Sequence, residues 1–343
     1  MSKTARYVLL FVMTAALALL VPSPAMAYES TPYGAIVALA VCAAYVFFCA
    51  LRKHEVNEKA AHSAGEFSAA AIAIIGRVPA VQLALWVIPA SLIGARLLYC
   101  LVRFGFYFVE MGPLSVLRVW EGGFLLYGAV FGAMTAAACL AKRGHVSVAA
   151  TLDELAAPGL LAIAVSRVGE WVTGEGVGTW IENEMWMRFP FAVMNEYEEW
   201  QLAVFLFEAA AALVLLIPVL REKVGRGRRI ETALLLFACC QIVFESMRMD
   251  SCLKIGFVRV SQVISALVIL AVTMLRAGRR GGKKEMLRRL LILVLCVAAV
   301  GGIEWALDKT PVNNIILYLV MTAACSVMMV NGGFPKSTEG NSK

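Results

Sequence analysis

The stretch ELAAPGLLAIAVSRVGEWVTGEGVG, residues 154–178, joins an apolar helix to a charged, glycine-rich end. Its first half is apolar enough to lie in a lipid bilayer, and its second half brings Arg167, Glu170 and Glu175 among four glycines. An ionisable side chain in or near a membrane span is costly, and it is usually paired or functional. The stretch therefore predicts a membrane helix that ends in a polar turn with a functional role.

The composition of the whole chain is that of a polytopic membrane protein. Its 343 residues are 61% hydrophobic and 16% charged, with a mean hydropathy of +0.78, whereas a soluble domain is about half apolar and a quarter charged. Several runs approach the roughly 20 apolar residues that cross a bilayer, and inside it every backbone polar group must be bonded within its own helix. We therefore expect an all-α fold. The predicted spans are residues 32–51, 80–102, 122–141, 154–172, 200–220, 231–247, 259–275, 287–307 and 313–331.

The amino-terminal residues 1–27 have the layout of a secretory signal peptide, with Lys3 and Arg6, an apolar stretch and a small-residue site before residue 28. An uncleaved extra helix is the alternative. Basic residues gather in alternate loops, which places residue 28 outside the cell and the carboxyl terminus in the cytoplasm. The same bias accounts for the net charge of +7, so we expect a membrane and not a nucleic acid as partner.

The polar segments divide the chain. The loop 173–199, which this orientation places outside, is acidic and aromatic. The run RAGRRGGKKEMLRR, residues 276–289, is predicted to be a basic cytoplasmic linker between a seven-span core at 28–275 and a two-span appendix with its tail at 290–343. The cysteines and histidines show no metal-ligand spacing, and no nucleotide-binding motif occurs, so we expect no metal site and no cofactor.

The glycine-rich turn indicates an anion site. An arginine beside exposed backbone N–H groups can hold a phosphate, and a phospholipid headgroup is the phosphate available at that depth. Glycines let the backbone turn sharply and approach a ligand closely. Arg96 near the end of the second span has snorkelling as its alternative role, and an interfacial ion pair is the alternative role of Glu245 with Arg248. The candidate phospholipid-binding residues are Arg167, Gly169, Gly174, Gly178, Arg248, Glu245 and Arg96.

Two neighbouring segments resemble the bacterial prolipoprotein diacylglyceryl transferase family. They are VLRVWEGGFLLYGAVFGAMTAAACLAKRGH and LDELAAPGLLAIAVSRVGEWVTGEGVG. The stretches IGARLLY, WQLAVFLFE and FESMRMD resemble further elements of that family, and the similarity covers about 32–275 in the right order. The matching residues include Asp153, Ala157, Pro158, Arg167, Gly169, Glu175, Gly178, Gln201, Glu208, Glu245, Arg248 and Asp250.

The resemblance implies a transferase in the bacterial plasma membrane. Such an enzyme moves a diacylglyceryl group from phosphatidylglycerol to the thiol of a lipobox cysteine in an exported prolipoprotein, at the outer face of the membrane. The thiolate attacks the glycerol carbon, a thioether forms and glycerol phosphate leaves. The resemblance also agrees with the seven-span core that has its amino terminus outside.

The departures from the family pattern bear on the chemistry. Glu170 and Thr173 replace two signature asparagines, and Tyr127 stands where the family presents a histidine in its third span. The candidate proton acceptors for the thiol are therefore Tyr127, Glu170 and Glu175. The alternative is a catalytically altered or inactive paralogue that binds phospholipid headgroups or membrane partners. A transporter or channel is less favoured, because the charged residues gather at span ends and not at the midplane.

Overall fold

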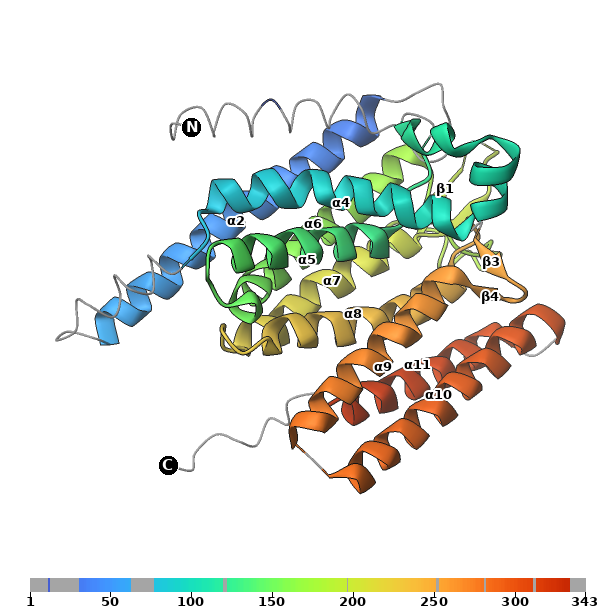
Figure 1. Ribbon diagram of the computed structural model, residues 1–343. Coiled ribbons are helices and arrows are strands. Elements are labelled where there is room, and N and C mark those ends of the chain that lie inside the picture. The colour runs from blue at the N-terminus through green and yellow to red at the C-terminus, as the bar shows by residue number, and fades with distance from the viewer. Residues whose placement is uncertain are drawn as a thin grey trace. The chain divides into compact units, whose positions relative to one another are not determined.

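The structure is a computed structural model, and its described part is predominantly helical (Figure 1). The predicted signal segment 1–27, apart from Val12, lies outside the described residues, and so do Trp120 and Glu121. The structure describes residue 12 and residues 31–62, 77–119, 122–195, 197–250, 253–280, 282–310 and 313–333.

Nine long α-helices stand in the described part of the chain, with four short strands and two irregular helical turns. The helices are α2 (Thr31–His62), α4 (Ala80–Val102), α5 (Leu126–Arg143), α6 (Val148–Thr173), α7 (Val204–Arg221), α8 (Arg228–Met247), α9 (Val260–Arg280), α10 (Lys283–Lys309) and α11 (Asn314–Asn331). The π-helical turn η1 is Gly105–Glu110, and the 3-10 turn η2 is Pro113–Leu117. The strands form two antiparallel hairpins, β1 (Ala192–Met194) with β2 (Trp200–Leu202) and β3 (Lys254–Ile255) with β4 (Val258–Arg259).

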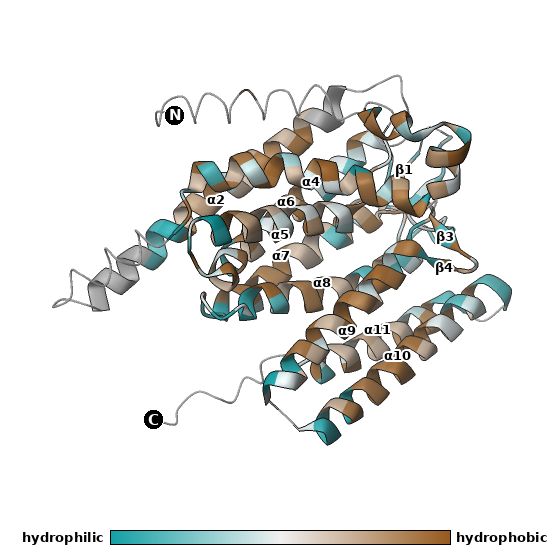
Figure 2. Ribbon diagram, in the orientation of Figure 1, coloured by the Kyte–Doolittle hydropathy of each residue, from teal (hydrophilic) through white to brown (hydrophobic). Residues whose placement is uncertain are grey.

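Eight of the described helices are long and apolar enough to cross a membrane. They are all of the long helices except α5, in which Lys142, Arg143 and small residues lower the mean hydropathy. Figure 2 shows the typical pattern in α10, which is apolar through its middle and polar at both ends. The prediction of an all-α polytopic membrane protein is confirmed, and the predicted third span is present as the helix α5.

The chain divides into two compact units. The first contains residues 1–176 and 205–230, and the second contains residues 177–204 and 231–343. The predicted linker is mostly helical, because α9 continues to Arg280 and α10 begins at Lys283. The second unit holds α9, α10 and α11 together, and α10 packs against both α9 and α11. The division into a seven-span core and a two-span appendix stays a prediction.

In the first unit, α4 and α5 pack through small residues. A Cβ on Gly94 would meet the carbonyl oxygen of Gly128, and a Cβ on Gly132 would meet that of Ala90. Such small residues let two membrane helices approach so closely that their backbones touch. The contact buries the neighbouring Tyr127 to 2% exposure. Helix packing therefore fixes the position of this candidate residue.

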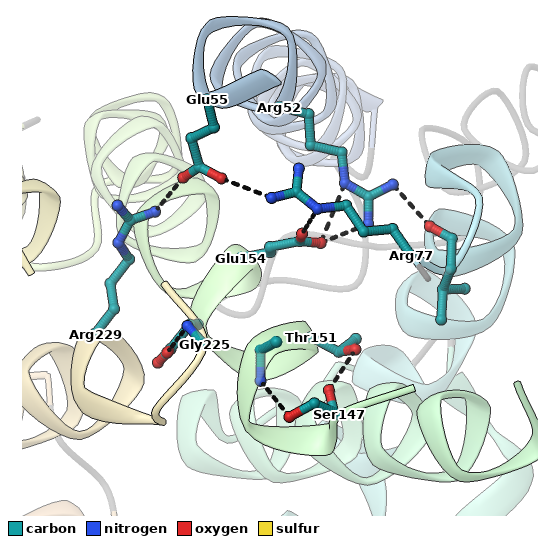
Figure 3. Close-up of polar contacts among 11 residues, drawn as sticks. Arg52, Glu55, Arg77, Ser147, Thr151, Glu154, Gly225 and Arg229 are labelled. Carbon is teal, nitrogen blue, oxygen red and sulfur yellow. Dashed lines mark hydrogen bonds and ion pairs between the residues drawn. The ribbon is translucent and has the colours of Figure 1, made fainter. Parts of the chain in front are cut away.

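A network of ion pairs connects four segments of the first unit (Figure 3). Glu154 of α6 accepts from Arg52 of α2 at 2.5 Å and from Arg77, which precedes α4, at 3.0 Å. Arg77 also pairs with Glu55 at 3.1 Å, and Glu55 pairs with Arg229 of α8 at 3.0 Å. The charges alternate in sign along this chain of contacts, so each carboxylate has two arginines and its burial is compensated.

Asp153, beside Glu154, caps the start of α8. Its carboxylate accepts the backbone N–H groups of Gly225, Gly227 and Ile230 at 2.8–3.0 Å. The side chain is completely buried. The first backbone N–H groups of a helix have no partner within the helix, and a carboxylate placed there also interacts favourably with the helix dipole. Asp153 thus holds the loop between α7 and α8 against α6.

We predict that Glu154→Gln destabilises the protein by about 3 kcal/mol, because removal of one partner from a buried ion pair leaves its arginines uncompensated. The control is Glu182→Gln, at an exposed glutamate. Unfolding of the two variants in detergent, followed by circular dichroism, measures the difference. Equal stability of the two variants would contradict a structural role of the network.

Candidate active site

The glycine-rich turn at the end of α6 adopts the conformation that its sequence predicts. Gly174 is left-handed with φ 68°, and its N–H group bonds to the carbonyl oxygens of Glu170 and Trp171. Gly176 is also left-handed, with φ 70°. A residue with a side chain is strained in this region, so the backbone favours glycine at both positions. The chain thereby reverses its direction within a few residues after α6.

Arg167 lies between two carboxylates of the first unit. Its Nη1 donates to Glu170 Oε1, one turn along α6, and its Nε lies 2.5 Å from Glu208 Oε2 on α7. The side chains of the two glutamates are 8% and 3% exposed, and that of Arg167 is 12% exposed. A guanidinium with several fixed donors is suited to such a shared contact. Arg167, Glu170 and Glu208, which we call the Arg167 triad, bind α6 to α7.

The turn closes over the Arg167 triad. A Cβ on Gly176 would collide with the Glu170 carboxylate and would come within 2.7 Å of Phe205 Cβ. Within α6, Gly169 faces α2, where a Cβ would collide with Ile36. Gly169 therefore serves helix packing, while Gly176 admits the Glu170 side chain. The backbone N–H of Glu175 donates to the carbonyl oxygen of Glu170 at 3.0 Å, so Glu175 also stabilises the turn.

Arg96 holds the loop that precedes α5. Its guanidinium donates to the carbonyl oxygens of Ser115 and Val116 at 3.1 Å, and also to that of Gly122. The cation lies over the ring of Tyr107, 4.9 Å from the centroid, and the residue is 2% exposed. These contacts with the chain itself assign Arg96 to loop positioning. The predicted lipid contact of Arg96 has no support in this geometry.

The second unit contains the other predicted residues. Arg248 lies just after α8 and forms a two-point ion pair with Asp250, at 3.0 and 2.8 Å. Glu245 accepts from Gln241, one turn earlier, at 3.1 Å. Gly178 forms a β-bridge with Arg248, and a Cβ on Gly178 would come within 2.7 Å of the carbonyl oxygen of Met247. A glycine is therefore needed at 178 for close backbone approach.

The structure adds one residue to the predicted site. Glu208 stands in a strongly apolar helix and is paired with Arg167, although sequence analysis treated it only as a charged residue and a family match. Its signal was an ionisable group in the interior of a span, which is rarely without function. Among the described residues, no group of three or more His, Cys, Asp or Glu side chains is arranged to hold a metal ion.

Comparison with known proteins gives a consistent family. A family model described as prolipoprotein diacylglyceryl transferase matches residues 26–277. The phosphatidylglycerol–prolipoprotein diacylglyceryl transferase of Listeria monocytogenes serotype 4b is 30% identical over 202 residues, which are 55% of this chain and 70% of that protein. The protein of the same name from Frankia alni is 30% identical over 215 residues, 58% of this chain and 55% of the relative. The one from Limosilactobacillus reuteri is 26% identical over 210 residues, 55% and 73% of the two chains.

The apolar helices and the family match together define a multi-pass bacterial membrane protein. The chain belongs to the prolipoprotein diacylglyceryl transferase family. The resemblance inferred from the motifs is therefore confirmed. Helices α10 and α11 lie beyond the matched residues.

We predict that Gly176→Ala destabilises the protein more than Gly174→Ala. Both substitutions place a side chain at positive φ, but the space around Gly174 is open, whereas a methyl group at 176 strikes the Glu170 carboxylate. Left-handed strain costs about 1–2 kcal/mol at either position, and the collision adds to it only at 176. The difference in thermal unfolding midpoint between the two variants isolates the packing on Glu170. A midpoint for Gly176→Ala at or above that for Gly174→Ala would contradict the described turn.

Proposed function

We propose that this chain transfers a diacylglyceryl group from phosphatidylglycerol to the cysteine thiol of an exported prolipoprotein. Membership of the family supports the reaction class, and the relatives that carry the full name of this activity support the substrates. The observation that carries the proposal is the Arg167 triad, a buried cation and two carboxylates beside the turn of the family-like motif. Such a triad offers both an anion-binding group and a proton acceptor.

The triad suits the two needs of the reaction. The thiol must lose its proton, because the thiolate is the nucleophile. The bond between the glycerol carbon and the phosphate oxygen then breaks, and the negative charge on the leaving glycerol phosphate needs a cation. We assign the proton to Glu170 and the phosphate to Arg167. When Glu170 takes the proton it loses its negative charge, while Glu208 remains paired with Arg167, and Arg167 becomes more attractive to phosphate.

Tyr127 and Glu175 keep supporting roles in this proposal. Tyr127 stands where the resemblance places a histidine, and it is almost completely buried. A phenol has an ordinary pKa near 10 and is a poor base at neutral pH, so we assign Tyr127 to hydrogen bonding with the substrate. Glu175, half-buried in the turn, is the second candidate for the proton. In the second unit, Arg248, which pairs with Asp250 and follows Glu245 in the sequence, is a candidate headgroup contact, and Gly178 bridges to its backbone. In the first unit, Gly174 shapes the turn after α6.

The distribution of charge supports the proposed orientation. Basic residues stand at the ends of alternate helices, including Arg143 of α5, Arg221 of α7 and Arg280 of α9. This bias favours a cytoplasmic location for those ends. The turn after α6 and the hairpin β1–β2 then face outward, at the outer leaflet of the plasma membrane. This location suits an exported protein substrate with a lipobox cysteine.

One observation favours a second function. Arg167 is already paired with two carboxylates, so a phosphate must compete with them for the guanidinium. This arrangement favours a paralogue with altered chemistry, which binds phospholipid headgroups or membrane partners without transfer. The two functions differ in product, because only the transferase makes a thioether-linked peptide.

We predict that purified protein in phosphatidylglycerol vesicles transfers labelled diacylglyceryl to a lipobox peptide, and that Arg167→Lys lowers kcat/KM at least about 100-fold, as removal of a charge-stabilising donor typically does. Arg188→Ala, at an exposed arginine, is the control and should keep full activity. Mass spectrometry of the peptide measures the product. Absence of a thioether product with the parent protein would reject the transferase, and headgroup binding without transfer would support the paralogue.

We also predict that Glu170→Gln lowers kcat by about 100-fold or more, since a positioned general base contributes roughly 100- to 10,000-fold. Glutamine keeps the shape of the side chain and its contact with Arg167 but cannot accept the proton. Glu182→Gln, at an exposed site, serves as control. A kcat for Glu170→Gln within about twofold of the parent would assign the proton to another residue, and the same assay on Glu175→Gln would then identify it.

A further inference from the structure

A further buried carboxylate lies in the part of the chain beyond the residues that the family model matches. Glu304 is in α10, beyond the matched residues 26–277, and is only 6% exposed. Its Oε1 accepts from Gln262 Nε2 of α9 at 2.5 Å and from the hydroxyl of Ser246 of α8. A buried carboxylate is stable only when donors surround it. Glu304 therefore joins α10 to the two preceding helices.

Helix α11 completes the same cluster. Ser246 Oγ lies 3.2 Å from Met321 Sδ, and the hydroxyl of Tyr318 points to the carbonyl oxygen of Ser246 at 3.4 Å. Gln262 also donates to Ser246 Oγ at 2.8 Å. We call Ser246, Gln262 and Glu304 the Glu304 cluster. Four helices thus meet around one serine near the end of α8.

The position of Ser246 relates the Glu304 cluster to the proposed headgroup contact. Ser246 lies in the last turn of α8, between Glu245 and Arg248. The backbone N–H of Arg248 bonds to the carbonyl oxygen of Phe244, and that of Met249 bonds to the carbonyl oxygen of Val177. Any shift of Ser246 would therefore move the backbone from which the Arg248 side chain extends.

Gln262 connects the Glu304 cluster to the hairpin β3–β4, which follows α8. Its Oε1 accepts the backbone N–H of Arg259 at 3.1 Å, where β4 ends and α9 begins. The amide is 3% exposed, and its Nε2 is directed by Glu304. Helix α10 also packs directly against β4. Glu304 therefore supports both segments that flank Arg248 and Asp250, the end of α8 on one side and the start of α9 on the other.

The opposite ends of the two added helices are also fixed. Arg276 of α9 donates to the carbonyl oxygens of Gly332 and Gly333, which follow α11, at 3.2 Å each. Arg289 of α10 donates to the carbonyl oxygen of Asn331, whose side chain returns a hydrogen bond to the backbone of Arg289. The pair α10–α11 is thus held at both ends, so the Glu304 cluster stands on a rigid support.

We propose that Glu304 is a positioning residue for the site, and that the added helices α10 and α11 hold the Arg248 segment in its binding geometry. This inference rests on the proposed function, in which Arg248 contacts the lipid headgroup. Glu304 touches no reacting atom and acts through Ser246 and Gln262. Its specific effect is on headgroup binding, because Arg248 is assigned to binding and not to proton transfer.

The first experiment measures the structural part without any activity. Hydrogen exchange of the full chain in lipid nanodiscs follows the backbone amides of residues 244–250. Glu304→Leu removes the charged acceptor that Ser246 and Gln262 share and leaves them their contacts with each other and with the carbonyl oxygen of Ile242. It should accelerate exchange there about tenfold, since a hydrogen bond to a charged group contributes more than a neutral one. Glu304→Gln keeps an acceptor oxygen and should stay within about twofold of the parent. Asp308→Leu removes an exposed carboxylate from the same helix and should have no effect on this segment.

Each outcome of the exchange experiment decides the structural part. Faster exchange of residues 244–250 in Glu304→Leu alone supports the inference. If residues 244–250 exchange at the same rate in Glu304→Leu and in Asp308→Leu, the inference is overturned. Faster exchange to the same extent in α4 and α5 of Glu304→Leu also overturns it, because the substitution then destabilises the protein generally.

The second experiment uses the transfer assay. Glu304→Leu should raise the KM for phosphatidylglycerol about tenfold and leave kcat within about twofold, and Glu304→Gln should restore KM. An unchanged KM overturns the positioning role. A parent protein without transfer activity rejects the proposed function, while the exchange result still decides whether Glu304 holds the Arg248 segment.

Discussion

A charge buried among apolar helices must be matched by an opposite charge or by hydrogen-bond donors, and this constraint shapes the candidate site at the Arg167 triad. Arg167 on α6 pairs with Glu170 on the same helix and with Glu208 on α7. The pairing fixes the two helices to each other at the point where α6 ends. The paired Glu170 carboxylate also lies close to the backbone of residue 176, where a Cβ would collide with it. The left-handed Gly176 avoids this collision.

The same constraint recurs in each unit with a different solution. In the first unit, Glu154 and Glu55 are matched by arginines from other segments, and Asp153 is matched by backbone N–H groups. In the second unit, Glu304 is surrounded by neutral donors from α8 and α9. Arginines give strong and directional pairing, whereas a neutral amide and a hydroxyl hold a carboxylate without removing its formal charge. The arginine pairs of Glu154 and Glu55 connect segments of the first unit, whereas the Glu304 contacts depend on the positions of two neutral donors.

The features that depend on local sequence patterns were predictable. Apolar runs of sufficient length gave the helices, since burial in a bilayer needs no partner of specified sequence. The glycines at 174 and 176 gave the turn, because a positive φ excludes most other residues. The partner of Arg167 on α7 was not predictable in this way, because the meeting of two distant side chains depends on helix packing. The partners of Arg96 were not predictable for a related reason, because they are backbone carbonyl oxygens, which every residue type carries.

The charge balance of the triad has a consequence for the order of the proposed reaction. With both carboxylates ionised, a phosphate near Arg167 meets a net negative group, so the cation is screened from it. After one carboxylate has accepted the thiol proton, the triad is neutral and the attraction to the leaving phosphate grows. Deprotonation of the nucleophile and stabilisation of the leaving group are thereby coupled through one arginine. A histidine base would change from neutral to a charge of +1 at the same step. The triad changes its formal charge by the same amount, from −1 to 0, when one of its carboxylates takes the proton. For the proposed reaction, this coupling is a physical reason to assign the proton to Glu170, at a site where the resemblance implies a histidine at the position of Tyr127.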